Sequence, residues 1–494
     1  MTAAVRLLAV WLTPALWLAM PALIVERGPE GVWIGLVLML APLIALASRS
    51  SAVSGRDHEP LLSVVILLFA VGILLWANMT LAADVATWLG APRWAAIAAT
   101  AVGGWLLTGW RAGGRLTPAL LLAAAVAISV PLGELGREAG VGPLGAWAQV
   151  ASQPAFRFPA ASPWVIPGRD LAMAHGHSPI VFDEEHRLIA PAGGRLQARV
   201  LDVGRATDLE WTLAPGQSVT LRAGDRLYPG PALRLRFEAD KRVPGAPASG
   251  IAWAAGGRPD WARQAGVLMT MLFGALALLR AGVADRIGRL EVAVAGGGLL
   301  VALLWAQGWA LYSLLGAPDL FLGGVTPERL LAMPSLGGDH PARSALQASL
   351  LAGALASFLA SSIALRERLG ALDRTGSGEI GYDLGLWAGV FAIAALASLR
   401  PMDPWFLALF ALGAAAAGLG PAALWGNEGV PSSVVTLAEL VGLVVFGSLT
   451  AVAQLRGEVT APLGGLLTYP ALAAVPSGVL VLWIGRRVVR SPSP

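Results

Sequence analysis

The chain of 494 residues is 56% hydrophobic and only 13% charged, and its mean hydropathy is +0.66. Soluble globular proteins carry about 25% charged residues, so this composition excludes an ordinary water-soluble domain and indicates lipid as the main solvent. The net charge of +4 comes from arginines scattered through the connecting segments, which is not a nucleic-acid-binding pattern. Cysteine is absent, which excludes disulfides, thiolate nucleophiles and cysteine-based metal sites.

Apolar segments of membrane-spanning length follow one another along the chain. A helix rises about 1.5 Å per residue, so about 20 apolar residues cross the hydrocarbon core of a bilayer. We therefore predict an α-helical polytopic membrane protein with about 12 spanning helices. The predicted spans are residues 5–25, 31–48, 61–83, 94–110, 118–133, 263–284, 290–313, 345–365, 384–400, 404–424, 434–455 and 461–485. The first contains Pro14 and Pro21 and is too long for the apolar part of a secretory signal, so we expect it to be retained.

One polar stretch interrupts the spans and divides the chain into three predicted regions. Residues 1–133 form a membrane region of five spans, and residues 262–494 form a second one of about seven. Residues 134–261 form one inserted small domain between them. The first part of this domain, residues 134–152, is expected to be helical or irregular and to lie along the membrane surface.

The distribution of arginine predicts which side of the membrane each connection faces. Cytoplasmic connections carry an excess of Lys and Arg, and arginine-rich connections alternate along this chain with poorer ones. The richer set comprises Arg49, Arg56, Arg111, Arg115, Arg280, Arg286, Arg289, Arg366, Arg368, Arg374, Arg486, Arg487 and Arg490. This pattern predicts cytoplasmic N- and C-termini and a periplasmic or extracellular location for residues 134–261. Frequent Ala, Gly and Arg with scarce Lys are typical of GC-rich bacteria, so we predict the bacterial inner membrane.

The second half of the inserted domain alternates apolar and polar residues, which is typical of β-strands. The alternating runs are residues 187–190, 195–200, 209–213, 218–222 and 233–237. Gly and Pro clusters separate them, at residues 192–194, 214–216, 223–225 and 228–230. Short alternating runs between such clusters predict a small all-β sandwich or barrel.

Three turn-rich stretches in this domain carry a local resemblance. They are residues 188–194 (LIAPAGG), 214–219 (APGQSV) and 222–227 (RAGDRL). With this spacing, residues 187–230 resemble the biotinyl/lipoyl barrel-sandwich domain, which also occurs in periplasmic adaptor proteins. The lysine that carrier members modify has no counterpart here, so the resemblance does not imply a carrier role. It implies nothing about the membrane helices.

A group of histidines and carboxylates before the first strand is a candidate metal site. His175 and His177 are two positions apart, and on a strand this spacing puts both rings on one face. His186 and one of the acidic residues 183–185 would complete a set of imidazole and carboxylate ligands suited to zinc or copper. The alternative is a solvated polar loop that leads into the first strand.

Polar residues inside predicted spans are a second group of candidates. Glu439 lies within the span 434–455, where an ionised carboxylate costs several kcal/mol unless it is paired, protonated or turned into the bundle. It is a candidate for proton relay or substrate contact, and the alternative is a structural hydrogen bond. Asn78 and Gln307, in the third and seventh spans, fit hydrogen bonds between helices.

A third candidate is the connection between residues 314 and 344, which is predicted to face outside. Residues 326–331 are expected to form a short helix, because Thr326 suits an N-cap and Pro327 the first helical position. Asp339 and His340 follow as a possible catalytic acid/base pair at the membrane surface.

Three classes of function remain compatible with these features. The first is an integral subunit or assembly scaffold of a membrane or envelope complex, whose outer β-domain docks a protein partner. The second is a secondary transporter that uses Glu439, although the five and seven spans show no repeated halves. The third is a transferase that acts on lipid-linked envelope substrates at the outer surface. The expected surroundings are the lipid bilayer and a protein partner, and the sequence identifies no cofactor.

Overall fold

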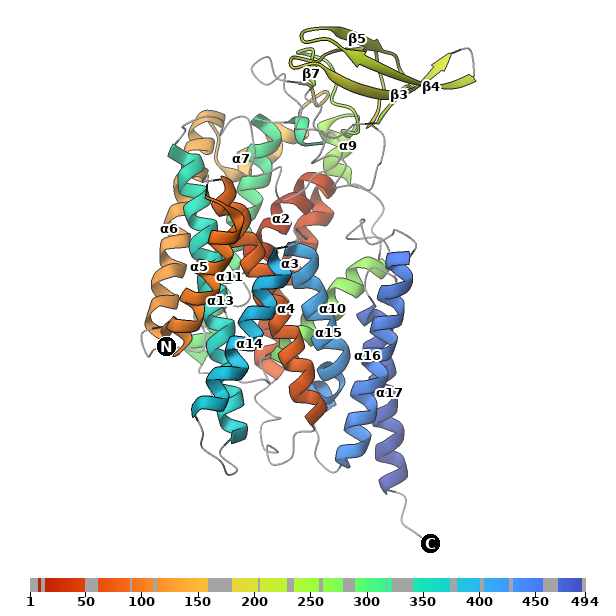
Figure 1. Cartoon of the computed structure of the whole chain (residues 1–494). Coiled ribbons are helices and arrows are strands. Elements are labelled where there is room, and N and C mark those ends of the chain that lie inside the picture. The colour runs from red at the N-terminus through yellow and green to blue at the C-terminus, as the bar shows by residue number, and fades with distance from the viewer. Residues whose placement is uncertain are drawn as a thin grey trace.

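The computed structural model shows a bundle of long helices with β-strands gathered at one end (Figure 1). The residues that it describes are 8–9, 14–48, 61–88, 91–109, 113–158, 180–202, 205–228, 235–256, 261–278, 289–316, 318–321, 341–373, 380–399, 404–425, 430–455 and 470–490. The last helix, α17 (Ala471–Arg490), ends at the end of the bundle opposite the β-strands.

Each predicted span overlaps a described helix over at least part of its length. Besides α17, the helices are α2 (Pro14–Arg27), α3 (Pro29–Ser48), α4 (Leu61–Trp88), α5 (Arg93–Gly109), α6 (Gly113–Ala139), α7 (Pro143–Ala151), α9 (Gly250–Ala255), α10 (Trp261–Leu278), α11 (Arg289–Gly316), the 3-10 helix η3 (Pro318–Phe321), α13 (Pro341–Asp373), α14 (Ile380–Ser398), α15 (Pro404–Trp425) and α16 (Ser432–Leu455). Among the described residues, 5 helices are long and apolar enough to cross a membrane, namely α4, α6, α11, α16 and α17. Shorter apolar stretches occur in α3, α10, α13, α14 and α15. The chain is thus mainly helical and has the apolar helices of a multi-pass membrane protein.

Helix α4 lies inside the bundle, whereas α6 lies at its surface. Of the apolar segment of α4, 67% is buried in the protein, whereas only 12% of that of α6 is. α4 packs against α5, α13, α14 and α15 and has a further contact with α16. On α6, Leu122 and Val126 are exposed, as expected of a helix that faces lipid. Because α4 lies inside the bundle, its polar side chains are the ones that need partners on neighbouring helices.

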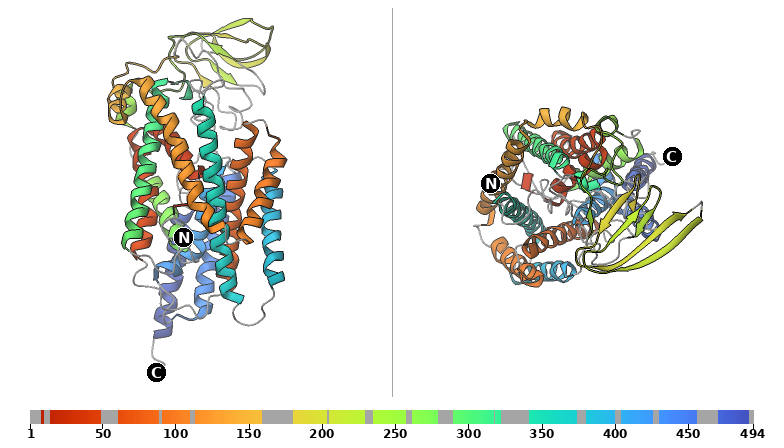
Figure 2. Two further views of the ribbon diagram at one scale, coloured as in Figure 1. Left: turned by 90° about the vertical axis from the view of Figure 1, so that its left-hand side faces the viewer. Right: turned by 90° about the horizontal axis from the view of Figure 1, so that it is seen from above.

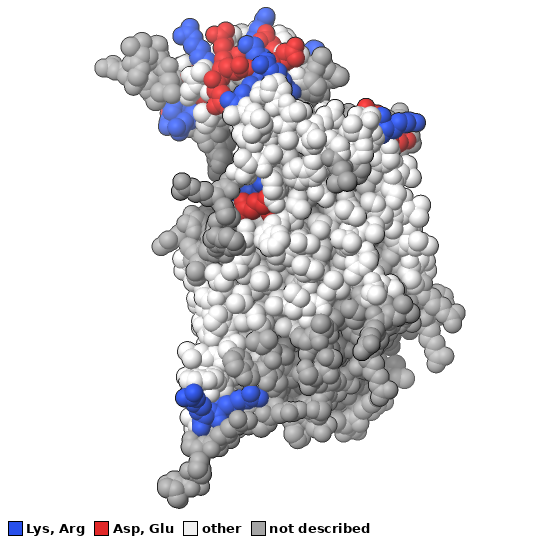
Figure 3. All heavy atoms as spheres, turned by 180° about the vertical axis from the view of Figure 1, so that it is seen from behind, with Lys and Arg blue, Asp and Glu red and all other residues white. Residues whose placement is uncertain are grey.

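Charged side chains gather mainly at the two ends of the molecule (Figure 3). In this view, most of the described surface between the ends carries neither Lys and Arg nor Asp and Glu. Arg486 and Arg487 lie in the last turns of α17, on the end away from the β-strands. A broad uncharged belt between two charged ends is what a membrane-embedded protein requires.

The β-strands form two antiparallel sheets. The strands are β1 (Ile180–Val181), β2 (His186–Ile189), β3 (Gly194–Asp202), β4 (Arg205–Leu213), β5 (Ser218–Leu221), β6 (Arg226–Tyr228) and β7 (Arg236–Phe237). Their orders are β1-β6-β3-β4 and β5-β2-β7. β2 to β5 follow the predicted alternation closely. β6 was not predicted, because its three residues lie between two turn clusters and are too few to show a period of two.

The segments that enter and leave the β-strands are paired with each other. The backbone N–H of Phe158 donates to the carbonyl oxygen of Lys241 at 2.9 Å, and that of Val243 donates to Phe156 at 2.9 Å. The rings of Phe158 and Phe237 stack with their centroids 4.7 Å apart, in the core between the sheets. This pairing closes the β region at its base, so the strands leave and return to the bundle at one place.

Two short helices connect this base to the bundle. α6 runs on to Ala139, past the predicted end of the fifth span, and the chain turns at Gly140 (φ +67°) into α7. α9 approaches α7 so closely that a Cβ added at Gly250 would lie 1.9 Å from the carbonyl oxygen of Val150. Residues 134–152 thus contain the end of α6 and all of α7.

Candidate functional site

Glu439 is buried in the bundle, as expected of a carboxyl group within an apolar helix. Only 1% of its surface is exposed, and one carboxylate oxygen accepts a hydrogen bond from the hydroxyl of Ser63 at 2.5 Å. Ser63 lies in the first turn of α4, and Glu439 lies about two turns into α16, so the bond joins the starts of two helices. A hydroxyl group hydrogen-bonded to a buried carboxyl group is the kind of contact that can hold or pass a proton.

Asn78 makes a second polar contact from α4, with helix α13. Its amide nitrogen donates to the hydroxyl of Ser357 on α13 at 3.1 Å and to the carbonyl oxygen of Leu74 at 2.9 Å. The side chain is 1% exposed, so the predicted hydrogen bond between helices is present. One turn beyond Ser357, the buried hydroxyl of Ser361 has no hydrogen-bond partner within the described part of the chain.

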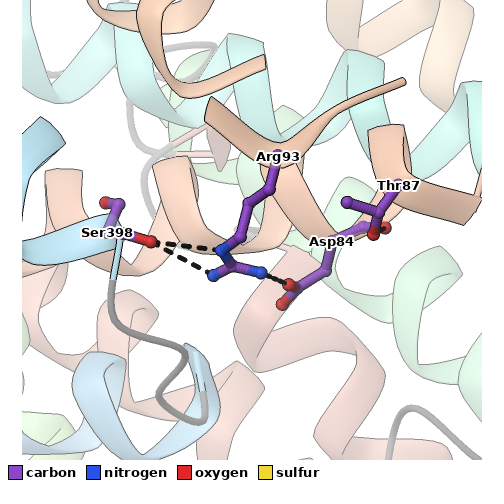
Figure 4. A network of polar contacts seen from close by, with 4 residues as sticks. All are labelled: Asp84, Thr87, Arg93 and Ser398. Carbon is purple, nitrogen blue, oxygen red and sulfur yellow. Dashed lines mark hydrogen bonds and ion pairs between the residues drawn. The ribbon is translucent and has the colours of Figure 1, made fainter. Parts of the chain in front are cut away.

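A third polar contact of α4 lies near its end and was not predicted (Figure 4). The guanidinium of Arg93, at the start of α5, pairs with the carboxylate of Asp84. The same guanidinium donates to the backbone carbonyl oxygen of Ser398 at 3.2 and 3.3 Å, so it joins α4, α5 and the end of α14. The predicted third span ended at residue 83. The helix continues to Trp88, and Arg93 compensates the charge of the Asp84 that it contains.

Gln307 does not join these groups. It is partly buried on α11 and forms no hydrogen bond with another described residue. α4 therefore takes part in the polar contacts of interest between helices, and Glu439 on α16 is the buried acidic member of the set. Ser63, Ser357 and Ser398 were missed, since a serine in an apolar run gives no sequence signal of its partner.

His186 is buried among aromatic rings at the start of β2. Its ring centroid lies 5.2 Å from that of Phe182, 5.9 Å from Phe237 and 6.2 Å from Phe158. Neither ring nitrogen has a hydrogen-bond partner among the described residues. Burial lowers the pKa of His186 below 6.5, against a smaller opposing effect of the nearby Glu184 carboxylate. Burial thus favours the neutral form of the ring.

The other predicted ligands and acid/base residues lie outside the described residues. These are His175 and His177 of the metal site, and Asp339 and His340 of the outer connection. Within the described ranges, no three His, Asp or Glu side chains come close enough to hold a metal ion. The metal and acid/base sites therefore stay predictions.

The hairpin of β3 and β4 offers a different kind of site, a free sheet edge. β4 is the last strand of its sheet, and no described strand pairs with its outer side. Both views of Figure 2 show the hairpin extending beyond the outline of the helices. On one face, Leu209 is 38% exposed and Trp211 is partly buried beside it. The opposite face carries exposed Asp208 and Glu210.

Asp208 is held in place across the hairpin by Arg199. The guanidinium donates to both carboxylate oxygens, at 2.7 and 3.0 Å. These hydrogen bonds keep the pKa of Asp208 below its ordinary value. Glu210 stands opposite Gln197 in the register and has no ion pair among the described residues. The edge strand therefore has an apolar face and an acidic face.

No protein-family model matches the chain, and no curated protein matches it. The resemblance of residues 187–230 to a barrel-sandwich domain therefore stays a prediction.

Proposed function

We propose that the protein is an integral subunit or assembly scaffold of a bacterial inner-membrane complex, and that its β region docks a periplasmic partner. In this proposal about 12 helices span the membrane, residues 134–261 form the periplasmic domain, and both termini are cytoplasmic. The arrangement of charge supports this orientation, because Arg486 and Arg487 lie on the end of the bundle away from the β-strands. Cytoplasmic ends of spans are the ones enriched in arginine.

The free edge of β4 is the observation that carries the docking proposal. A sheet edge presents unpaired N–H and C=O groups, which an extended segment of another chain can join as an added strand. Soluble proteins usually block such edges, whereas β4 is nine residues long and projects away from the bundle. Exposed Leu209 and the partly buried Trp211 beside it provide an apolar contact surface for the added strand.

The two faces of β4 define the chemistry of the partner segment. An added strand would place alternate side chains beside Leu209 and Trp211, so those positions are expected to be apolar. The positions between them would lie beside Asp208 and Glu210, where Lys, Arg or hydroxyl side chains are favoured. A second copy paired on the same edge about Leu209 would set Asp208 opposite Glu210, which disfavours self-association.

Site-specific photo-crosslinking in cells tests the docking proposal. A photoreactive residue at Thr207 on β4 is expected to give one discrete protein adduct. The same residue at Thr220, which is exposed on β5, is expected to give none. Leu209→Arg should abolish the Thr207 adduct, because it puts a cation on the apolar face. The absence of any adduct from β4 at native expression would count against docking at this edge.

Two proline substitutions separate strand addition from loss of the hairpin. Successive residues of a strand point their N–H groups to opposite sides. Of Thr207→Pro and Asp208→Pro, one therefore removes an outward donor and the other breaks the pairing with β3. For this comparison the photoreactive residue is moved to Thr212, which is also exposed on β4. Strand addition predicts that the less destabilising substitution still abolishes the adduct. If that variant retained the adduct in full, side chains alone would hold the partner.

Glu439 favours a second candidate, a proton-coupled transporter. Its buried carboxyl group and short bond to Ser63 join two helices at one level of the bundle. In proteoliposomes, Glu439→Gln is expected to abolish protein-dependent proton flux measured with a trapped pH dye, and Glu439→Asp to retain part of it. Equal flux in the wild type and Glu439→Gln would exclude this role. The transferase alternative rests on Asp339 and His340, and loss of an envelope product on His340→Ala would favour it.

A further inference from the structure

One face of α17 carries exposed apolar side chains and ends in an arginine. Leu480, Trp483 and Ile484 are 54%, 42% and 48% exposed, and Arg487 is exposed as well. Their spacings of three and four residues place these side chains on one side of the helix, one turn above another. The face therefore runs from an uncharged stretch to a cation, at the end of the bundle away from the β-strands.

This face points away from the described neighbours of α17. The helix packs against α10, α15 and α16 with its other side, and only 28% of its apolar segment is buried in the protein. α17 is also one of the described helices that are long and apolar enough to cross a membrane. In a membrane, the exposed apolar side chains of such a helix contact the acyl chains of lipids.

Trp483 positions the guanidinium of Arg487 at the edge of the apolar stretch. The guanidinium carbon lies 4.0 Å from the centroid of the Trp483 ring, which is a cation–π contact. Trp483 lies about one turn before Arg487, so this contact draws the cation back along the helix towards Leu480 and Ile484. Tryptophan in spanning helices is enriched at the level of the lipid headgroups. The guanidinium is therefore placed to meet the phosphate of a lipid whose acyl chains lie along this face.

The charges at this end of the molecule select an anionic lipid. Arg486 and Arg487 follow each other in α17, and this helix contains no Asp or Glu. The adjacent helix α16 contains one carboxylate, Glu439, which is 1% exposed and bonded to Ser63 inside the bundle. In Figure 3 the described surface at this end likewise shows Lys and Arg without Asp and Glu. Two arginines attract a headgroup with a net negative charge more strongly than a zwitterionic one, whose ammonium offsets its phosphate.

We propose that this face of α17 binds an anionic phospholipid of the phosphatidylglycerol class, with its acyl chains along Leu480 and Ile484 and its phosphate at Arg487. A guanidinium can donate two parallel hydrogen bonds to one phosphate, so the contact is directional as well as electrostatic. The proposal requires that α17 lie in a membrane. It does not depend on partner docking at β4 or on a role for Glu439 in proton transfer.

Quenching of a single fluorophore by brominated lipids tests the proposal on the complete protein in bilayers. The chain has no cysteine, so one introduced cysteine gives one labelled position. A label on Leu480→Cys lies against the acyl chains of the proposed lipid. With a phosphatidylcholine host, we expect brominated phosphatidylglycerol to quench this label at about fivefold lower mole fraction than brominated phosphatidylethanolamine.

A second label position gives the reference for ordinary lipid contact. Val444 is 58% exposed on α16, a helix that contains no Lys or Arg. A label on Val444→Cys should therefore be quenched equally by the two lipids. Equal quenching at Leu480→Cys as well would overturn the proposal. A label at Leu480→Cys that neither lipid quenches, beside normal quenching at Val444→Cys, would overturn it too, because protein and not lipid would then cover this face.

A charge substitution with a matched control locates the headgroup. In the protein labelled at Leu480→Cys, Arg487→Gln should reduce the preference for phosphatidylglycerol from about fivefold to below about twofold. Arg137→Gln is the control, since Arg137 is an exposed arginine in the last turn of α6, and it should leave the preference unchanged. A full preference in the Arg487→Gln variant would overturn the site.

Discussion

Trp253 donates its indole N–H to the backbone carbonyl oxygen of Val25 at 2.9 Å, across 228 positions of the chain. Val25 lies in the last turn of α2, where carbonyl groups lack partners within the helix. Gly28, with φ +59°, then turns the chain into α3 beneath the carbonyl oxygen of Trp253. The end of α2 is therefore completed by a side chain of α9, which follows the β region in the chain.

Loss of this indole donor is expected to destabilise the protein measurably. Trp253→Phe retains an aromatic ring beside Trp147, whose centroid is 4.9 Å from that of Trp253, but leaves a buried carbonyl unpaired. We expect a loss of about 1–3 kcal/mol. Trp253→Ala also empties the site, with a loss of about 3–5 kcal/mol. Thermal unfolding in detergent measures both, and equal stability of the two variants would show that the ring does not matter.

Gly250→Ala is expected to disrupt the contact between α7 and α9. The new Cβ would lie 1.9 Å from the carbonyl oxygen of Val150, so one helix must move. We expect more than about 2 kcal/mol of destabilisation. Gly133→Ala is the control, because its Cβ meets nothing within 4 Å and alanine is favoured in a helix by about 1 kcal/mol. Unfolding curves that rank the two variants in the reverse order would contradict this packing.

The stability of the β region is expected to fall at acidic pH because of His186. The folded-state pKa of His186 lies below the ordinary 6.5, so the unfolded chain binds the proton more readily. Its contribution is therefore complete above about pH 6.5 and is lost as the pH falls towards the lowered value, by at most about 1.4 kcal/mol per pH unit.

His186→Phe tests this dependence, since it keeps a ring among Phe158, Phe182 and Phe237 but removes the titration. Unfolding between pH 7.5 and 5.5, with a metal chelator present throughout, is expected to show a smaller loss of stability in the variant. Parallel pH profiles for the two proteins would mean that His186 does not titrate on unfolding.

Arg93→Ala is expected to weaken the junction of α4, α5 and α14. Arg93 pairs with Asp84 and donates twice to Ser398, and both charged side chains are about a quarter exposed, at 24% and 25%. Partial exposure screens the pair, so we expect about 1.5–2 kcal/mol of destabilisation. Arg27→Ala removes the more exposed pair with Glu26 and should cost less than about 1 kcal/mol. Similar losses in both variants would show that the junction with Asp84 is an ordinary surface pair.

A topology reporter decides the predicted orientation. Alkaline phosphatase inserted after Gly204, between β3 and β4, is expected to be active because that enzyme folds only outside the cytoplasm. The same reporter fused after Pro494 should be inactive. Cytoplasmic activity at Gly204 would reject the orientation and the periplasmic partner together.

Periodicity and length allowed much of this fold to be predicted. Alternation over residues 195–200 and 209–213 identified β3 and β4. On β3 the alternation corresponds to burial, because Leu196 and Ala198 are buried whereas Arg195 is exposed. β1 and β6 have two and three residues, and they owe their structure to pairing with each other and with β3. Such short strands depend on tertiary contacts that leave no local pattern.

The polar contacts of the bundle were predictable only from their charged or amide members. Glu439 and Asn78 stood out because they are costly in an apolar helix. Ser63 and Ser357 did not, since a serine can bond to its own helix and needs no partner. Asp84 was assigned to a connection, because only the position of Arg93 in space allows the helix to contain it.

The interior position of α4 has a consequence for synthesis in the cell. α4 is synthesised before α13, α14, α15 and α16, against which it packs. Until those helices are made, Asn78 lacks Ser357, and the pair of Asp84 and Arg93 lacks the carbonyl oxygen of Ser398. The interval in which α4 lacks its final polar partners therefore lasts from residue 88 until residue 398 has been made.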